Sequence, residues 1–376
     1  MPATDYARDL SIVPDTVCLD TVGPDTATDD TPTADTVFVR TRLRPYLREL
    51  LGAEETAWKQ RGAPSHDAVD ALAAFMDGGK SLRPRFCFWG HRAGGDGPES
   101  PHLLAACAAL ELLHAFALIH DDLMDASPTR RGNPALQHQL TAQHCAQGWA
   151  GGAEQYGTAV AMLAGDLAFA LASRLAAGLP PRAQEIWHEL VAELTCGQYM
   201  DMAGAARGDR SVEVALTIAR LKSGRYTVAG PLRLGAALAP GNSLDAALGR
   251  FGEMVGEAFQ LRDDLLGVFG DPRWTGKPVG DDLRSGKPTL LLAYATRQTP
   301  PHRAALLARV GSPDLSDPEI AAITAACDEC GARERVEQRI ERDLRAAQRL
   351  ALASDVTPAA RGALCALARS AAHRCS

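Results

Sequence analysis

Two pairs of adjacent aspartates, about 140 residues apart, are the groups in this 376-residue sequence whose spacing suggests chemistry. The first pair, Asp121-Asp122, is followed by Asp125. Because Asp121 and Asp125 are four residues apart, a helix would place both carboxylates on one face, about 6 Å apart. His114 precedes Asp121 by seven residues, almost two turns, and would share that face.

Carboxylates crowded at one helix end repel one another and oppose the helix dipole, so a bound cation would stabilise them. Mg²⁺ suits such a site, since it takes a few carboxylate oxygens and completes its shell with water and phosphate. Alone, the motif is equally compatible with a solvated, Asp-rich helix end. The second pair, Asp263-Asp264, favours the metal. Two pairs facing each other could hold Mg²⁺ ions around one diphosphate.

Basic residues suited to phosphate lie next to both acidic pairs. Arg offers two parallel donors to phosphate, and Lys offers a mobile point charge. The residues concerned are Lys80, Arg83, Arg130, Arg131, Lys222, Lys277 and Lys287, with Ser223 beside Lys222. Each alone would be an ordinary surface cation, but together they indicate binding of anionic ligands.

The elements that position these residues are predicted to be helices almost throughout. The chain is rich in Ala, the best helix former, and strand-like alternation is nearly absent. Gly and Pro cluster between the helical segments. Helices are predicted over residues 38–60, 66–76, 102–125, 156–178, 182–205, 212–239, 243–269, 288–297, 302–310, 317–331, 333–352 and 357–373. The sequence therefore predicts an all-α fold, a single large helical bundle over residues 37–376.

Residues 1–36 differ from the rest of the chain in charge and composition. They contain eight Asp and one Arg, with Asp-Thr repeated every five residues, and are predicted to form a disordered acidic tail. The remaining chain has 38 acidic and 38 basic residues. No basic field is left for nucleic acid, so none is expected as a partner.

The sequence also indicates a soluble, cytoplasmic protein. The N-terminus has no basic and apolar signal-peptide pattern. The most apolar stretch, around 103–119, is interrupted by Glu111 and His114, so stable membrane insertion is not expected. Nine cysteines without regular spacing favour reduced thiols in a reducing compartment.

Six motifs are spread over residues 40–370: GGKSLRP, ELLHAFALIHDDLMDASPTRRG, AGD (164–166), GQYMD (197–201), KSGRYT and FQLRDDLLGVFGDPRWTGKPVGDDLRSGKPT. With these motifs the chain resembles the trans-isoprenyl diphosphate synthases, the polyprenyl synthetase family, and within it a geranylgeranyl diphosphate synthase most closely. The resemblance implies an isoprenoid-synthase bundle with a central active-site cavity, a homodimer, and Mg²⁺-dependent joining of isopentenyl diphosphate to an allylic diphosphate.

The same resemblance implies a role for each matching residue. About three Mg²⁺ ions would be held by the two Asp motifs, chiefly by Asp121, Asp125 and Asp263, with Asp122 and Asp264 beside them. The allylic diphosphate would contact Arg130, Lys222, Ser223, Gln260, Lys277 and Lys287. Isopentenyl diphosphate would be bound by Lys80, Arg83, His114 and Arg131. Asp121, Asp125, Asp263, Lys222 and Lys277 would be the catalytic set.

The second motif departs from the family pattern DDxxD, because Gly267 stands where the last Asp is usual. Activity is nevertheless expected, since Asp263 is the principal ligand of that motif in the family. Product length is expected to depend on Phe116 and Ala117. A small residue next to an aromatic at these positions resembles the makers of the C20 product, geranylgeranyl diphosphate, and two aromatics resemble the makers of the C15 product.

Three alternatives remain open on the sequence. The first is a farnesyl diphosphate synthase, which differs only in product length. The second is a terpene cyclase, which would need a different second motif that is not present. The third is a non-catalytic synthase subunit, which would be expected to have lost its Asp motifs.

Overall fold

The computed structural model describes residues 33–63, 67–95, 97–240, 244–271, 280–312 and 314–373. Strands in these ranges are limited to β1 (Thr129–Arg130) and β2 (Asn133–Pro134), which pair as an antiparallel hairpin. All other regular elements of the described chain are helical, so the predicted all-α fold is confirmed. The predicted acidic tail lies almost wholly outside the described residues.

Helix α5 (Leu103–Met124) carries the first Asp motif and lies in the core. Half of its residues are buried, and they lie on several faces of the helix, as expected for a helix that is apolar all round. It packs against α4 (Leu82–Arg92) and along α7 (Ala153–Ala177), which in turn packs against α6 (Leu136–Ala146). By length and hydropathy α5 and α7 could each cross a membrane, but α5 is a buried core helix here.

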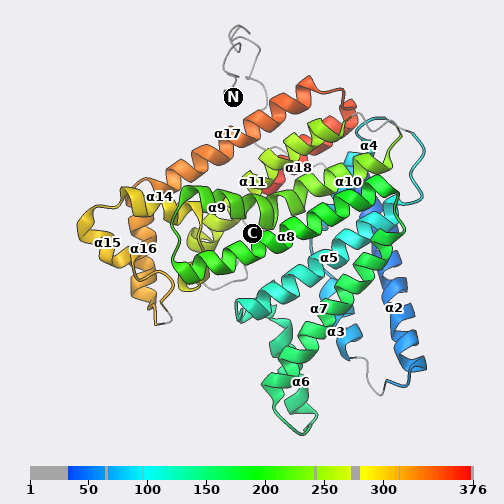
Figure 1. Cartoon of the computed structure of the whole chain (residues 1–376), viewed down its shortest axis with the longest axis horizontal. Helices are drawn as coiled ribbons and strands as arrows, with labels where there is room; N and C mark the ends of the chain where they lie inside the picture. The colour runs from blue at the N-terminus through cyan, green and yellow to red at the C-terminus, as the bar shows by residue number, and fades with distance from the viewer. Residues whose placement is uncertain are drawn as a thin grey trace, which may run out of the picture. The chain divides into compact units, whose positions relative to one another are not determined.

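A second group of helices carries Lys222 and the second Asp motif (Figure 1). It comprises α8 (Pro181–Arg207), α9 (Val212–Ile218), the π-helical segment η2 (Ala219–Ala229), α10 (Gly230–Leu238) and α11 (Asp245–Phe269). Segment η2 packs between α8 and α11. The widened turns of a π-helix recur at functional sites, and η2 contains the KSGRYT motif.

The remaining helices cover this core. At the N-terminal end these are α1 (Ala34–Phe38), the π-helical η1 (Val39–Leu43), α2 (Arg44–Gln60) and α3 (Asp67–Met76). At the C-terminal end they are α13 (Asp281–Arg284), α14 (Leu290–Gln298), α15 (Pro301–Leu307), α16 (Asp317–Glu329), α17 (Ala332–Ala353) and α18 (Pro358–Ala372). Figure 1 shows α17 running alongside α11, and the two helices pack together.

The structure differs from the sequence prediction mainly in short elements. The GGKSLRP segment was expected as a turn before Pro84, but α4 begins at Leu82 and includes that proline. Pro is tolerated in a first helical turn, where its missing N–H needs no partner. Helix α6 and the β1–β2 hairpin were not predicted. Helix α1 begins at Ala34, inside the predicted tail, and the buried Asp35 forms an ion pair with Arg85.

Candidate active site

A cavity of about 650 Å³ collects most of the predicted site residues. Those that line it are Lys80, Arg83, His114, Ala117, Asp121, Arg130, Arg131, Lys222, Ser223, Gln260, Asp263, Asp264 and Lys287. Three predicted residues, Phe116, Asp122 and Asp125, are not part of the lining. Lys277 lies outside the described residues. Residues more than 200 positions apart in the sequence therefore meet around one space.

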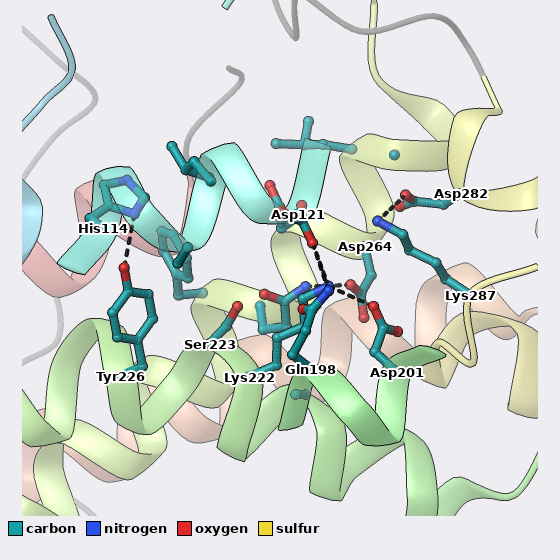
Figure 2. A pocket seen from close by; sticks show the side chains of 18 of the residues that line it. His114, Asp121, Gln198, Asp201, Lys222, Ser223, Tyr226, Asp264, Asp282 and Lys287 are labelled. Atoms are coloured by element: carbon teal, nitrogen blue, oxygen red, sulfur yellow. Dashed lines mark hydrogen bonds and ion pairs between the residues drawn. The ribbon is translucent and has the colours of Figure 1, made fainter. Parts of the chain in front are cut away.

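Helix α5 presents His114, Ala117 and Asp121 to this cavity, as their spacing predicts. Figure 2 shows Asp121 pointing toward Lys222 and Gln198 on the neighbouring helices. Lys222 Nζ lies 3.0 Å from Asp121 Oδ1, and Gln198 Nε2 donates to the same oxygen at 3.2 Å. Burial disfavours the charged carboxylate. The charges of Lys222, Lys287 and Arg130 outweigh burial and hold the pKa of Asp121 below its ordinary value, so this carboxylate is ionised at neutral pH.

Lys222 reaches the cavity because α8 and η2 approach closely. A Cβ atom on Gly197 would lie 2.3 Å from the backbone nitrogen of Lys222, so only glycine permits this contact. On the far side of its ammonium group, Lys222 Nζ donates to Asp201 Oδ2 at 2.6 Å. Burial alone would lower the pKa of Lys222, but Asp121 and Asp201 raise it, and the side chain is a cation held between two anions.

The β1–β2 hairpin places Arg130 and Arg131 at the cavity. Its two-residue turn is Arg131-Gly132, and both residues have positive φ angles, as type I′ turns require. Arg130 Nε donates to both carboxylate oxygens of Asp122, at 3.0 and 2.9 Å. The carboxylate of Asp122, a residue only 1% exposed, thus binds the lining residue Arg130 and is not itself part of the lining.

The last two turns of α11 bring the second Asp motif to the opposite wall. Asp263, Asp264 and Gln260 all line the cavity there. Gln260 Nε2 donates to Asp264 Oδ1 at 2.7 Å. Burial, followed by the charge of Asp282, raises the pKa of Asp264 well above its ordinary value. Asp264 therefore holds a proton more tightly than Asp121 does, although both belong to Asp pairs.

Lys287 connects the two sides of the site. Its Nζ atom lies 2.9 Å from Asp125 Oδ2, at the end of α5, and 3.6 Å from Asp282 Oδ1, in α13. Burial opposes its charge, but Asp282, Asp121 and Asp125 raise the pKa of Lys287 well above its ordinary value. Asp125 therefore belongs to the site through this ion pair.

A second cationic group gathers around His114 and Arg83. The Arg83 side chain is 8% exposed, donates to Thr227 Oγ1 at 2.8 Å, and stacks its guanidinium 4.2 Å from the ring centre of Tyr226. His114 Nδ1 lies 3.0 Å from the Tyr226 hydroxyl (Figure 2). Burial, reinforced by nearby arginines, lowers the pKa of His114 well below its ordinary value. His114 is therefore a neutral hydrogen-bonding group at pH 7.

Arg131 lies on the other side of this second group. Its guanidinium packs against Gly79 and over the ring of Phe75, 5.4 Å from the ring centre. Half-buried Glu111, on α5, also lines the cavity near this group, and it accepts from Ser81 Oγ at 3.0 Å. Burial raises the pKa of Glu111. The second group is therefore more cationic than the first.

The donor set fits a divalent metal. Within the described parts of the chain, no group of three or more His, Cys, Asp or Glu side chains forms a ready-made metal site. Mg²⁺ does not require such a cage, since it retains waters and binds through one or two carboxylates plus substrate phosphates. Asp121 and Asp125 supply ionisable carboxylates from α5, and each holds a lysine ammonium where a cation would bind.

Sequence reasoning missed several residues of the cavity. Gln198, Asp201 and Tyr226 lie inside motifs that it quoted, GQYMD and KSGRYT, but it gave them no role. The three-residue spacing of Gln198 and Asp201 could have placed both on one face of α8. Asp282 also lies inside a quoted motif, beside Asp281, but its approach to Gly267 of α11 is a contact that the motif alone does not show.

The chain is similar in sequence to known proteins. The polyprenyl synthetase family model matches residues 68–327. A geranylfarnesyl diphosphate synthase from Aeropyrum pernix is 34% identical over 279 residues, covering 72% of this chain and 81% of the relative. A (2E,6E)-farnesyl diphosphate synthase from Mycobacterium bovis is 34% identical over 303 residues, covering 78% of this chain and 76% of the relative.

Solved structures show the same fold. The geranylgeranyl pyrophosphate synthase of Corynebacterium glutamicum, complexed with isoprenyl diphosphate and magnesium, is 39% identical with a TM-score of 0.84, covering 90% of this chain and 99% of that one. A polyprenyl synthase from Caulobacter crescentus, complexed with calcium and isoprenyl diphosphate, is 27% identical with a TM-score of 0.72, covering 92% and 99%. The chain is therefore a prenyltransferase and belongs to the polyprenyl synthetase family.

Proposed function

We propose that this enzyme condenses isopentenyl diphosphate with allylic diphosphates and that its main product is the C20 compound, geranylgeranyl diphosphate. One observation carries the proposal. A single cavity contains two separate cationic groups, one interleaved with the Asp motifs and one around Arg83 and Arg131. Two diphosphates would occupy these groups, and both open onto the same space.

The first group suits the allylic diphosphate and its metal ions. Asp121, Asp125 and Asp263 would hold about three Mg²⁺, which would stabilise the charge of the departing diphosphate. Arg130, Lys222, Ser223, Gln260 and Lys287 would contact that diphosphate, with Lys277 proposed from its motif alone. Asp122 supports this group by orienting Arg130. Asp264, protonated more readily, would hold Gln260 in place.

The second group suits isopentenyl diphosphate. Lys80, Arg83 and Arg131 supply positive charge, and neutral His114 supplies a hydrogen bond. Holding the two substrates side by side converts a bimolecular step into an effectively unimolecular one. The allylic C–O bond breaks and diphosphate leaves. The isopentenyl double bond then attacks the allylic carbon, and the product cation loses a proton to the released diphosphate. Apolar residues in the lining, among them Leu118, Leu194 and Ile218, would limit the access of water to that cation.

The wall below Asp121 supports the C20 product. Ala117 lines the cavity one turn before Asp121, together with Leu118. Phe116 is directed elsewhere, with its ring centre 5.0 Å from that of Phe169 and 4.6 Å from that of His120. A growing tail would therefore meet a methyl group at 117 and would not be blocked by the aromatic ring. The C15 product is the second candidate, because one of the relatives is a farnesyl diphosphate synthase.

An exposed apolar surface on α5, α7 and α8 supports a homodimer. Met162 and Leu163 on α7 are 47% and 56% exposed, and Tyr199 on α8 is 65% exposed. These helices meet at the end of α5, where His120 Nε2 lies 3.3 Å from the Met162 carbonyl and Gln198 Nε2 lies 3.5 Å from Met124 Sδ. Covering this surface with a second copy would bury it from water. Cytoplasmic localisation, without membrane insertion, is part of the same proposal.

The experiment that tests the activity is incubation of the purified full chain with isopentenyl diphosphate, Mg²⁺ and each allylic primer in turn. Chain length of the products is then measured. A C20 main product from C5, C10 and C15 primers is expected. A C15 main product would show that the proposed product is wrong and that the proposed reaction is right. Formation of a cyclic hydrocarbon, or no turnover with any primer, would overturn the proposed reaction.

A further inference from the structure

The missing carboxylate at Gly267 leaves a space that another carboxylate fills. A Cβ atom built on Gly267 would lie 1.9 Å from Asp282 Oδ2 and 2.7 Å from Asp282 Cγ. Distances this short exclude any side chain at 267 while Asp282 keeps its position. Gly267 therefore lacks a side chain at the one place where the Asp282 carboxylate approaches the α11 backbone.

Asp282 belongs to the same cavity as the second Asp motif. Asp263, Asp264, Gly267 and Asp282 all line it, although Asp282 comes from α13, after the segment that follows α11. The Asp282 side chain is 13% exposed, and its Oδ1 atom lies 3.6 Å from Lys287 Nζ. Figure 2 shows Asp282 and Lys287 facing each other at the edge of the site, beside Asp264.

Lys287 gives a second, independent indication of a cation at this place. The same ammonium contacts Asp125 of the first motif at 2.9 Å. Asp125 and Asp282 thus share one bound positive charge across the two sides of the cavity. The ammonium of Lys287 lies between two carboxylates, and carboxylates with bound waters are also the ligands that Mg²⁺ takes.

We infer that Asp282 supplies the carboxylate that position 267 lacks, and that it serves with Asp263 on the second side of the divalent-metal site. This inference rests on the proposed function and adds to it a residue outside both Asp motifs. Asp282 can then hold this position only because Gly267 has no side chain, which leaves space for the Asp282 carboxylate. The second motif is completed by a residue 15 positions further along the chain.

A relocation of the carboxylate tests the inference. Asp282→Asn removes the charge and keeps the shape. The double variant Gly267→Asp/Asp282→Ala moves the carboxylate to the usual position, and the Cβ atoms of the two residues would then be 3.5 Å apart, an ordinary contact. Gly267→Asp alone places two carboxylates in one space. Asp314→Asn, at a side chain 77% exposed, is the charge-matched control.

The measurement is the rise in melting temperature as Mg²⁺ is added to full-length protein with a fixed excess of inorganic pyrophosphate. Loss of a carboxylate that supports a metal site weakens metal affinity by about 10- to 100-fold. Asp282→Asn is therefore expected to raise the Mg²⁺ midpoint by that factor, and the double variant is expected to restore it to within about threefold of wild type. Gly267→Asp alone is expected to lower the melting temperature without ligand.

The outcomes separate this inference from the function on which it rests. If wild type responds to Mg²⁺ and pyrophosphate but Asp282→Asn keeps the same midpoint, the inference is wrong and the proposed function stands. If Asp282→Asn weakens the response and the double variant does not restore it, Asp282 has a merely structural role, and the inference is again wrong. If wild type shows no response, the proposed function fails and the inference with it.

Discussion

The ammonium of Lys222 lies 3.0 Å from the carboxylate of Asp121, and their side chains are only 19% and 15% exposed. A proposed phosphate-binding group thus neutralises a proposed metal ligand while the site holds neither ligand. The charges on Asp121 and Lys222 are each stabilised mainly by the other's presence, because burial disfavours both.

Replacing Asp121 with Asn should abolish activity and also weaken the metal-free protein. Loss of one charge-stabilising group costs about 100- to 1,000-fold in turnover. Lys222 and Lys287 would in addition lose a shared counter-charge, so the melting temperature in EDTA should fall while the helical circular dichroism is retained. Asp314→Asn is the control. Turnover near wild type at saturating Mg²⁺ would refute the role of Asp121.

Replacing Arg83 with Ala should raise the KM for isopentenyl diphosphate more than the KM for the allylic primer. Arg83 belongs to the second cationic group, and a hydrogen bond to a charged ligand is worth about 1.5–3 kcal/mol. The expected increase is therefore roughly 10- to 100-fold. Arg48→Ala, at an exposed ion pair with Asp77, is the matched control. Equal increases for both substrates would contradict the division into two subsites.

Replacing Ala117 with Phe should shorten the main product from C20 towards C15. The new ring would fill the passage below Asp121, and overpacking costs about 1–3 kcal/mol. That range disfavours a further elongation by about tenfold or more. Total turnover should fall less than chain length, because the charged residues are unchanged. Phe116→Ala is the comparison, since Phe116 does not line the cavity. If the main product of the Ala117 variant is still C20, the growing chain does not pass residue 117.

Replacing His114 with Gln should reduce the loss of stability in mild acid. The folded-state pKa of His114 lies well below 6.5, so below pH 6.5 the unfolded chain binds a proton that the folded chain does not. This contribution to stability is full above pH 6.5 and is lost as the pH falls. Melting temperatures at pH 7.5 and 5.5 are compared for both proteins. If the melting temperature of the variant falls equally far between these pH values, His114 does not contribute to the loss of stability in acid.

Deleting residues 1–33 and deleting residues 1–36 should have different effects. The shorter deletion removes only the residues of the predicted acidic tail that precede α1. The longer one also removes Asp35, a residue only 1% exposed whose ion pair with Arg85 connects α1 to α4. Breaking a buried pair costs about 3–5 kcal/mol. Urea unfolding of the two truncated proteins measures the difference, and equal stabilities would show that Asp35 is dispensable.

The long helices could be predicted from the sequence, and so could the site residues that share one helical face, because both depend on local periodicity. The spacing of His114, Ala117 and Asp121 places them on one helical face regardless of the rest of the chain. The direction of a neighbouring residue is harder to predict, as Asp122 shows. Asp122 is adjacent to Asp121 but binds Arg130, which lies on a hairpin that the sequence pattern did not predict.

Other features depend on contacts between distant segments and were beyond sequence reasoning. The start of α1 at Ala34 is stabilised by an ion pair with a residue 50 positions away. The opposite pKa shifts of Asp121 and Asp264 depend on which lysines and carboxylates surround each one in the folded chain. Motif position alone treats these two aspartates alike.

The two-residue turn Arg131-Gly132 has a consequence for how the binding of the two diphosphates is coupled. In the proposed function Arg130 contacts the allylic diphosphate and Arg131 contacts isopentenyl diphosphate, and both belong to one short hairpin that lines the cavity. A first substrate that immobilises this hairpin reduces the conformational entropy that the second must still give up. The two diphosphates would then bind with positive cooperativity, through a few backbone torsions and with no movement of the helices around them.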